Sequence, residues 1–413
     1  MPQDTAARDT MLDQPYFGER LKALRLERGL SQAALAGETI STPYLSRLES
    51  GARRPTAKVV SYLAGRLNVS PRAFEAAPPV SPLGQALASA NSAGEVVLST
   101  ELAAMLRAED RSAPTALRWQ ALWLLARAHG AQAQHAEEYA ILTELGALSD
   151  EMGVPELRAR TDVALANSAR SLGEIARASE HAAAAVAQAG PLPLADRIAA
   201  LDALVSAQAE AGQLVPARLR ADELVRLTEP GGGPALTRAL WASATVAIRQ
   251  GDWSRAQADL ERALAGLSSQ DDLELWMRLR LAAASLLLQI TPPQTAAARA
   301  RLTESEPAVN LVGTEQNRQE LILLQALVAF KERRYDEARE RCAALDGREL
   351  QLSFRDRIRL EALQSMLGIL GGGGADGVAR LQELAQQASD TQNVELAAEL
   401  WRELAIGLAE RRE

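Results

Sequence analysis

Residues 18–75 decide the fold of the first part of the chain: GERLKALRLERGLSQAALAGETISTPYLSRLESGARRPTAKVVSYLAGRLNVSPRAFE. Leucines and other apolar residues recur here at helical spacing, and Gly29 and Gly51 stand where a helix would stop. The pattern predicts five short amphipathic helices around one small core, in a domain that spans residues 17–75. The first helix is expected at 17–28.

The centre of this segment, residues 31–50, has the pattern of a helix-turn-helix. Ser31 is expected to cap a second helix at 32–37, and Ser41 or Thr42 to cap a third helix that runs to Ser50. Leu45 and Leu48 would face the core, so the opposite face of the third helix would be exposed, at Thr42, Pro43, Ser46 and Arg47. Since a helix-turn-helix lays a helix in the DNA major groove, the pattern predicts DNA binding.

Charge separates this head from the rest of the chain. The 413 residues carry a net charge of −8, but residues 18–72 hold ten Lys/Arg against four Glu, a net of +6, and residues 81–413 a net of −11. A basic head on an acidic body fits a phosphate-binding module joined to a domain that does not bind DNA. We expect a flexible tail at 1–16, a proline-rich semi-rigid linker at 76–82 and a second domain at 83–413.

The composition also narrows the class of protein. Apolar residues make up 47% and charged residues 24%, an ordinary soluble mixture. We find no secretory signal and no apolar run long enough to span a membrane, and therefore expect a cytoplasmic protein. Lysine occurs only at Lys22, Lys58 and Lys331, a bias that favours a GC-rich bacterial genome.

The motifs LSQAALA, YLSRLESG and RRPT resemble the Xre, or lambda-repressor-like, helix-turn-helix family over residues 18–75. The resemblance implies that Gln32 bonds a phosphate, and that base edges are met by Thr42, Pro43, Ser46 and Arg47, with Ser41 and Tyr44 beside them. It also implies backbone contacts from Arg53, Arg54, Thr56 and Lys58. In one departure from the family pattern, the segment between Ala36 and Ser41 is one residue short and lacks the usual turn glycine. We therefore expect a tighter turn or an earlier end to the second helix.

Several head residues also have a structural interpretation. Arg25 and Arg28 are expected to be solvated charges on a helix face rather than DNA contacts. Tyr44 fits the edge of the core as well as a phosphate contact. Glu49 is expected to pair with a neighbouring arginine or to cap a helix rather than to read a base.

Beyond the linker the sequence predicts helices almost throughout, with small residues that recur at a regular interval. The strongest are the alanines that end GEIARA, GQLVPA, GDWSRA and RRYDEA. We place the anchors at Ala178, Ala217, Ala256 and Ala338 and, with a weaker match, at Ala297 and Ala379. Twelve residues before each anchor stand Ala166, Val205, Ala244, Ser285, Ala326 and Leu367. The segments 83–110 and 117–152 look like further helical pairs.

This pattern resembles the tetratricopeptide repeat, with a longer period than the usual ~34 residues. Such repeats stack into a superhelix whose concave face is formed by the first helix of each pair. The register projects eight residues toward that face as a candidate ligand groove: Asn167, Arg170, Asp202, Ser206, Glu210, Trp241, Thr245 and Arg249. An extended peptide would suit such a mixture of amide, hydroxyl, charged and aromatic groups. The alternative is that several of these residues are solvated or form pairs between repeats.

Signals for catalysis or metal binding are weak. Residues 372–377 (GGGADG) match a dinucleotide-binding pattern but follow a predicted helix, so we expect an inter-helix turn. The three histidines have no metal-ligand spacing with Cys342 or with one another, and Cys342 has the spacing of a buried residue. The sequence thus predicts no enzyme, no metal and no cofactor.

Two hypotheses follow for function. The first is a cytoplasmic transcriptional regulator that binds operator DNA as a homodimer and senses a peptide or protein ligand through its repeats. The second is a repeat scaffold for protein interactions whose helical head does not bind DNA. A third idea, a regulatory enzyme or phosphatase aid, has no residue to support it.

Overall fold

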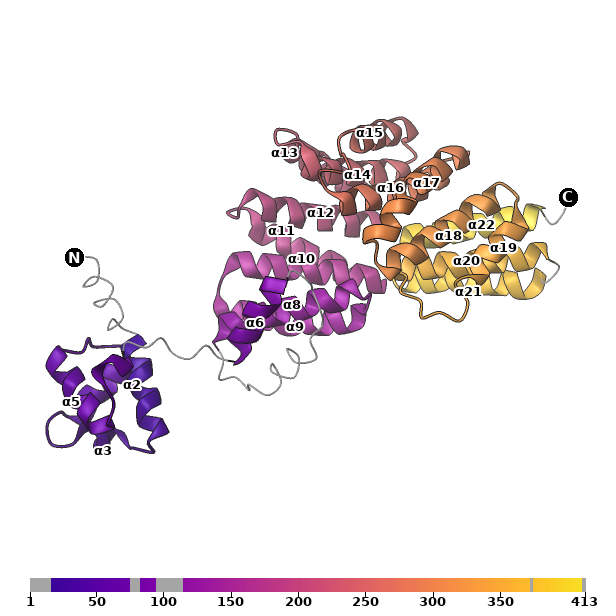
Figure 1. Cartoon of the computed structure of the whole chain (residues 1–413). Helices are drawn as coiled ribbons and strands as arrows, with labels where there is room; N and C mark the ends of the chain where they lie inside the picture. The colour runs from indigo at the N-terminus through magenta and orange to yellow at the C-terminus, as the bar shows by residue number, and fades with distance from the viewer. Residues whose placement is uncertain (1–15, 75–81, 94–113, 372–373, 411–413) are drawn as a thin grey trace. The chain divides into compact units, whose positions relative to one another are not determined.

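The computed structural model describes residues 16–74, 82–93, 114–371 and 374–410 (Figure 1). Every regular element in these ranges is a helix, which confirms the predicted all-α fold. The chain divides into two compact units, residues 1–85 and 86–413. The expected tail (1–16) and linker (76–82) fall outside the described residues except at Tyr16 and Pro82, each of which begins a helix.

The first unit contains the helical head. Its elements are α2 (Tyr16–Glu27), α3 (Gln32–Ala36), α4 (Thr42–Glu49), α5 (Ala57–Leu67) and the 3₁₀ helix η1 (Pro71–Phe74). Four of the five predicted helices are therefore α-helices, whereas the fifth is a single 3₁₀ turn. A further helix, α6 (Pro82–Ala93), begins near the boundary between the two units.

One apolar cluster holds the head together. Phe17 and Phe74, from the two ends of the domain, pack with ring centroids 5.2 Å apart. The other fully buried side chains come from all four α-helices: Leu21, Leu35, Leu45, Leu48, Leu63 and Leu67. Each fully buried leucine contributes about 1.5–3 kcal/mol relative to exposure. This core fixes α4 against α2 and leaves its opposite side free to face a ligand.

The second unit consists of helical pairs. After α8 (Thr115–Ala131) and α9 (His135–Met152), a first and a second helix alternate along the chain. The first helices, here called inner helices, contact one another in succession and are α10 (Pro155–Leu172), α12 (Leu194–Glu210), α14 (Gly233–Arg249), α16 (Leu273–Gln289), α18 (Glu315–Lys331), α20 (Phe354–Leu370) and the terminal α22 (Val394–Glu410). The second helices, here called outer helices, are α11 (Ile175–Ala189), α13 (Leu214–Thr228), α15 (Trp253–Ala265), α17 (Thr295–Val312), α19 (Tyr335–Ala343) and α21 (Gly374–Asp390).

A small residue stands at the fourth position of every outer helix. Four of these residues are the predicted anchors Ala178, Ala217, Ala256 and Ala338, all fully or almost fully buried. The two weaker predictions were wrong. Ala297 is half-buried and Ala379 is exposed, and their places are taken by the buried Ala298 and Gly377. A side chain this small lets the outer helix approach the inner helix of its own pair.

The corresponding place on the inner helices is the twelfth position. Ala166, Val205, Ala244 and Ala326 occupy it as predicted and are buried. In the other two pairs Ala284 and Ser365 stand there, instead of the predicted Ser285 and Leu367. In the last pair both positions shift by two residues toward the N-terminus, whereas in the pair of α16 and α17 the anchor moves one residue toward the C-terminus and the inner position one residue toward the N-terminus.

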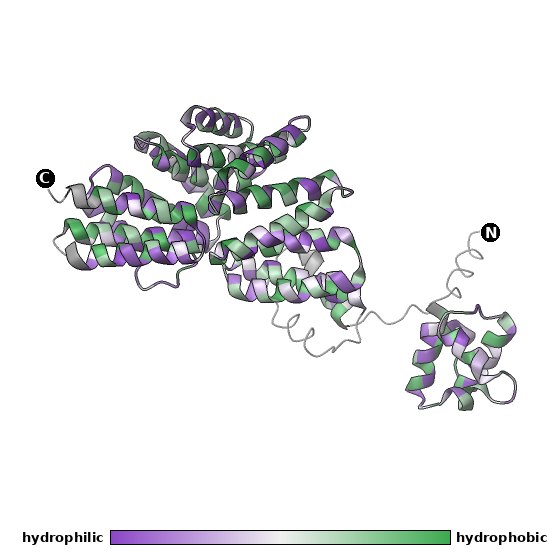
Figure 2. Cartoon of the chain, turned by 180° about the vertical axis from the view of Figure 1, so that it is seen from behind, coloured by the Kyte–Doolittle hydropathy of each residue, from purple (hydrophilic) through white to green (hydrophobic). Residues whose placement is uncertain are grey.

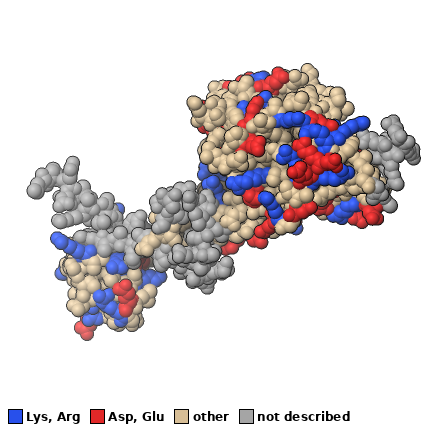
Figure 3. All heavy atoms as spheres, turned by 45° about the vertical axis from the view of Figure 1, so that its right-hand side comes forward, with Lys and Arg blue, Asp and Glu red and all other residues tan. Residues whose placement is uncertain are grey.

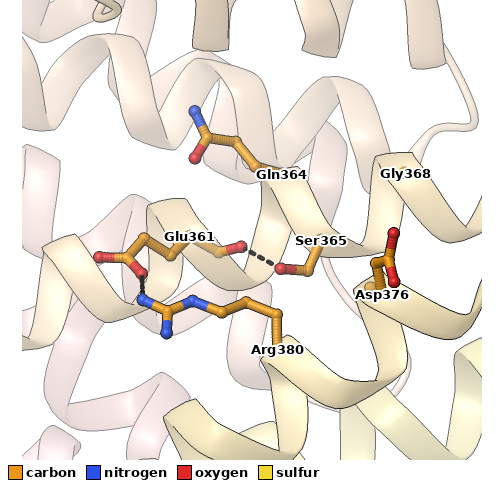
Figure 4. A pocket seen from close by; sticks show the side chains of 7 residues that line it. Glu361, Gln364, Ser365, Gly368, Asp376 and Arg380 are labelled. Atoms are coloured by element: carbon orange, nitrogen blue, oxygen red, sulfur yellow. Dashed lines mark hydrogen bonds and ion pairs between the residues drawn. The ribbon is translucent and has the colours of Figure 1, made fainter. Parts of the chain in front are cut away.

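The last complete pair, α20 and α21, shows why the anchor must be small. A Cβ on Gly377 would lie 2.8 Å from the carbonyl oxygen of Ser365. Residues 374–377 of the GGGADG segment therefore belong to the first turn of α21 rather than to an inter-helix turn. A surface hollow lies over this junction, and Arg380 crosses it to pair with Glu361 (Figure 4).

The tight turns between helices share one backbone conformation. The residue two places before α11, α13 and α15 is a glycine with φ of 72–83°, at Gly173, Gly212 and Gly251. The same place before α9 and α19 is held by Ala133 (φ 55°) and Arg333 (φ 59°). Glycine adopts this left-handed conformation without strain, so the glycines that mark the repeats in the sequence have a local geometric cause.

The array of pairs closes on itself, because α10 contacts α20 and α12 contacts α22. The Nδ2 atom of Asn393 donates a buried hydrogen bond to the carbonyl oxygen of Gly173, at 2.8 Å. The ring of Phe354 covers the same glycine, and Val394 covers Gly212. Two repeat turns thus contact residues at the starts of α20 and α22.

Hydropathy follows this arrangement. Hydrophobic and hydrophilic residues alternate around the helices (Figure 2), which is the amphipathic pattern expected of packed helical layers. In the described part of the chain, no helix combines the length and apolar character needed to cross a membrane.

Candidate nucleic-acid interface and inner face of the repeats

The predicted helix-turn-helix is formed by α3 and α4. The hydroxyl of Ser31 accepts a hydrogen bond from the backbone N–H of Ala34 (3.1 Å), and that of Ser41 accepts one from Tyr44 (3.3 Å). Ser31 and Ser41 are therefore the N-caps of the two helices, which resolves the alternative between Ser41 and Thr42. Pro43 lies in the first turn of α4, where its missing N–H leaves no bond unmade.

The turn between the two helices begins earlier than the family pattern suggests. Helix α3 ends at Ala36, and Gly37 follows with φ 58°. A Cβ on Gly37 would lie 2.7 Å from the hydroxyl oxygen of Tyr62, which donates a hydrogen bond to the Ala36 carbonyl (2.9 Å). The short connection is thus accommodated by an early helix end, and Gly37 takes the place of the expected turn glycine.

The predicted DNA contacts lie mostly on the exposed surface of the head. Exposed members of the set come from α4, from the loop after it and from the start of α5: Ser41, Thr42, Pro43, Ser46, Arg47, Arg53, Arg54, Thr56 and Lys58. Tyr44 and Gln32 are half-buried. Thr56 also caps α5 by accepting from the backbone N–H of Val59 (3.4 Å). The residues expected to meet bases and those expected to meet phosphates therefore belong to consecutive segments of one domain.

Arg53 and Tyr44 lie together beside α4. The guanidinium carbon of Arg53 is 5.1 Å from the centroid of the Tyr44 ring, within the range of a cation–π contact. This contact holds the arginine near the N-terminal turn of α4. Tyr44 thus has a local structural role, while a phosphate contact stays a prediction.

A buried network connects α2, α3 and α4. The Arg25 guanidinium binds both carboxylate oxygens of Glu49, at 2.6 and 3.0 Å, and donates to the Leu30 carbonyl at 2.8 Å. Gln32 donates to Glu49 at 2.7 Å. The expectation that Arg25 is a solvated charge was wrong, because only 9% of its side chain is exposed to solvent. The expectation that Glu49 pairs with a neighbouring arginine is confirmed.

The hydrogen bond to Glu49 raises the pKa of Arg25 against the effect of burial, so its guanidinium stays charged. Sequence periodicity placed Arg25 next to Leu24 and Leu21 but could not show which carboxylate it would meet, since Glu49 is 24 residues away. Gln32 is the first residue of α3. One N–H group of its side-chain amide binds Glu49, which orients the side chain toward the protein.

The inner face of the repeats brings together four of the eight predicted groove residues. Arg170 pairs with Glu210 at 3.1 Å, across α10 and α12. Asp202 and Arg249 belong to the same electrostatic cluster, because Asp202 interacts with Arg170, and Arg249 with Glu210. The four charged residues among the eight predictions therefore lie in one region of the inner face.

The other four predictions are distributed differently. Asn167 is exposed, and Ser206 is half-buried. Trp241 packs against apolar clusters between α14 and its neighbours, and Thr245 donates to the Trp241 carbonyl at 3.0 Å. Trp241 and Thr245 thus take part in packing within the repeats, and a ligand contact by any of the four stays a prediction.

Sequence analysis missed a second row of charges on the inner helices. The sixth residue of five successive inner helices is charged: Arg238, Arg278, Glu320, Arg359 and Glu399. Arg359 binds both oxygens of Glu399, at 2.9 and 2.8 Å. This recurrence was visible in the sequence, but only once the inner helices were aligned by their true starts. On the face shown in Figure 3, basic and acidic side chains of the repeats lie side by side.

Burial shifts the pKa of several of these groups. Burial and the neighbouring Asp356 raise the pKa of Glu320 to about 8. Burial alone would raise the pKa of Glu210, but Arg170, Arg355 and Arg249 bring it below its usual range. Burial and Arg355 lower the pKa of Arg249 to about 10. Within the described ranges, no group of three His, Cys, Asp or Glu residues is arranged to hold a metal ion.

Comparison with known proteins agrees with both parts of this architecture. Residues 21–74 match the model of the helix-turn-helix family. No curated protein sequence matches the chain significantly.

Among solved structures, similar folds are found in a Rap protein complexed with Competence and Sporulation Factor (TM-score 0.52, 10% identity, 95% of this chain and 98% of that chain covered) and in the Rap conjugation gene regulator of plasmid pLS20 in complex with the Phr* peptide (0.52, 12%, 93% and 98%). PlcR of Bacillus thuringiensis, in complex with the peptide PapR7 and DNA, gives a TM-score of 0.39 at 14% identity, with 74% of this chain and 98% of that chain covered.

At these identities the likeness to the Rap structures is one of fold. It agrees with the array of helical pairs described above. The chain therefore carries a helix-turn-helix domain at residues 21–74, followed by a domain of tetratricopeptide-like helical pairs.

Proposed function

We propose that the protein is a sequence-specific DNA-binding transcriptional regulator. The observation that carries the proposal is the exposed side of α4. Its exposed side chains are Thr42, Pro43, Ser46 and Arg47, whereas Leu45 and Leu48 on the opposite side are buried in the core. Base readout requires such a polar face at the start of a helix that a small domain holds rigidly. The net charge of +6 over residues 18–72 supplies attraction to phosphate.

Phosphate contacts are assigned to the segment that follows α4. Arg53, Arg54, Thr56 and Lys58 are exposed, and Arg53 lies over the Tyr44 ring. Contacts of this kind position the domain on the duplex, whereas the α4 side chains select the sequence. A single domain of this size reads few base pairs, so we propose a cytoplasmic homodimer on two half-sites about one helical turn apart.

The repeat domain is proposed to sense a peptide or protein ligand on its inner face. The support is the cluster formed by Arg170, Asp202, Glu210 and Arg249, which combines both charges on one face. The two Rap structures of similar fold are described as complexes with Competence and Sporulation Factor and with the Phr* peptide. A peptide can bind in an extended form and presents backbone and side-chain hydrogen-bonding groups, which polar inner helices can match.

Binding of the full chain to DNA selected from a random-sequence duplex library, measured by fluorescence anisotropy at graded salt, tests the DNA-binding proposal. The Arg53→Ala/Arg54→Ala variant is expected to reduce the slope of log K against log salt by about 2, because each lost phosphate contact removes about 0.9. Arg28→Ala, which removes an arginine that donates to the Leu24 carbonyl of its own helix, serves as the control and is expected to keep the slope.

Selection of no sequence, or binding that does not depend on salt, would refute the proposal and favour a repeat scaffold. Loss of selectivity in Arg47→Ala with an unchanged salt slope would assign Arg47 to base readout rather than to the backbone.

A further inference from the structure

Among the described residues, three arginines on the inner helices have buried nitrogen atoms without a hydrogen-bond partner, and one of them, Arg170, already binds Glu210 through its Nη1 atom. In the other two arginines these atoms are Nη1 of Arg249, at the end of α14, and Nε and Nη2 of Arg355, at the start of α20. The two side chains influence each other electrostatically, and 16% of the Arg355 side chain is exposed. Unsatisfied cationic donors from two distant repeats are therefore close enough to interact electrostatically.

The carboxylates in this region are already occupied. Glu210 pairs with Arg170 at 3.1 Å. Glu399 binds Arg359 through both oxygens and lies only at 3.9 Å from Arg355. Glu210 acts electrostatically on Arg249 and Arg355, and Glu395 acts on Arg249, but none of these carboxylates makes a hydrogen bond to the buried nitrogen atoms of the two arginines.

A buried guanidinium that lacks partners is costly, since its desolvation is not offset by hydrogen bonds. Burial and Arg355 lower the pKa of Arg249 to about 10, which reflects this unfavourable environment. Perturbed ionisable groups of this kind concentrate at binding sites, where the missing partner is a ligand. An anion between the two arginines would provide it.

An apolar cavity of about 200 Å³ lies between α16, α18, α20 and α22, and one of its lining residues, Arg359, acts electrostatically on Arg249. Its walls are mainly apolar and include Leu288, Phe330, Leu363, Met366, Leu400 and Ile406. Arg359 and Glu399 also line it, and Glu399 is the group that approaches Arg355. The cavity is smaller than the roughly 300–1,000 Å³ of pockets for drug-sized ligands and fits one large apolar side chain.

We propose that Arg249 and Arg355 bind a carboxylate and that the apolar group attached to this carboxylate enters the apolar cavity. This inference rests on the proposed peptide sensing: the ligand is then a peptide whose last residue is apolar and whose C-terminal carboxylate is free. A small branched organic acid carries the same chemistry. Paired arginines suit a carboxylate because their N–H groups match its two oxygens in geometry and charge.

The first arm of the test uses 4-methylpentanoate, which resembles the last residue of such a peptide, and 4-methylpentanamide as its uncharged match. Saturation-transfer NMR on the full chain is expected to show binding of the acid and at least ~tenfold weaker binding of the amide, a difference of about 1.4 kcal/mol. Arg249→Gln and Arg355→Gln are each expected to abolish the preference for the acid. Arg357→Gln, an exposed site on the same helix α20, is the matched control and is expected to retain it.

The second arm uses a synthetic pentapeptide library, made once with free C-terminal carboxylates and once with C-terminal amides, in affinity selection with the full chain. Retention of carboxylate peptides that end in Leu, Ile, Met or Phe supports the peptide source. Acid binding without peptide retention supports the site but assigns it to a small acid, so that peptide sensing fails and the site stands.

Equal retention of both libraries, together with equal binding of the acid and the amide, would overturn the carboxylate site and leave peptide sensing intact. Absence of all binding would overturn both. The comparison of acid with amide needs only the wild-type chain, so it decides the matter even where a variant does not fold.

Discussion

The buried network of Arg25, Glu49 and Gln32 makes a quantitative prediction about the head. Glu49→Ala would leave the Arg25 guanidinium buried with a single protein acceptor, the Leu30 carbonyl at 2.8 Å. It would also leave the amide of Gln32 without its 2.7 Å acceptor. Removal of one partner from a buried ion pair costs about 3–5 kcal/mol, because the remaining charge is uncompensated. We expect the free energy of unfolding of the head to fall by this amount.

Hydrogen–deuterium exchange of the full chain, followed by mass spectrometry of peptides from α2 and α4, measures this loss without relying on tryptophan, which the head lacks. A loss of 3 kcal/mol corresponds to a decrease of about 150-fold in amide protection. Glu38→Ala, an exposed acidic site in the turn of the same domain, is the control and is expected to change protection by less than about threefold.

A third variant separates the charge from the packing. Arg25→Met/Glu49→Met replaces the pair with apolar side chains. Its free energy of unfolding is expected to lie within about 1 kcal/mol of the wild-type value, since an apolar pair of similar volume leaves no buried charge without a partner. A loss of protection of less than about tenfold in Glu49→Ala would refute the reasoning. So would a double variant that is as unstable as the single one.

Three more variants address the repeat domain. Arg249→Gln should raise the free energy of unfolding of the repeat domain by up to about 3 kcal/mol, because a pKa lowered to about 10 means that the buried charge destabilises the folded state. A calorimetric scan should therefore show a higher melting temperature, and an unchanged or lower one would contradict this. Glu320 has a folded pKa of about 8, above its unfolded value, so the stability that its protonated form provides is complete below about pH 4.5 and lost as the pH rises through 8. Denaturant titration should therefore show the wild type losing about 2 kcal/mol between pH 6 and 8 relative to Glu320→Gln, and parallel curves would contradict this. Ala133→Gly should stabilise the chain by about 0.5–1 kcal/mol in urea titration, because Ala133 has φ 55°; a loss of stability would show that the turn is not strained.

The head could be predicted almost residue by residue because its signals are local. Ser31, Ser41 and Thr56 are helix caps that act over three residues, and leucine spacing identifies the buried side of each helix. What escaped was the partner of Arg25. The Arg25–Glu49 contact spans 24 residues, and no periodicity within either helix encodes it.

The type of repeat could be predicted from the sequence, but the packing positions could be predicted in only some of the repeats. Three of the four strong anchors follow one another 39 residues apart, whereas Ala298 follows Ala256 by 42 and Ala338 follows Ala298 by 40. Loops between helices tolerate changes in length at little cost, so a fixed period drifts while the packing position does not. Gly377 was also hidden because a glycine in GGGADG suggests a turn rather than a packing site.

The charged interior depends on a contact that only the folded array reveals. Gly173 and Gly212 mark repeat turns in the sequence, yet the same turns receive Phe354, Asn393 and Val394 from the far end of the chain. This contact brings α10 to α20 and α12 to α22, and so turns an open face of inner helices into a confined one. The burial of Glu210 and Arg359 strengthens the Arg170–Glu210 and Arg359–Glu399 pairs, and burial also raises the cost of each cation that lacks a partner. The closure of the array is therefore the physical reason why side chains that would be solvated on an open superhelix are buried here, and it is what would make Arg249 and Arg355 selective for an anion in the proposed site.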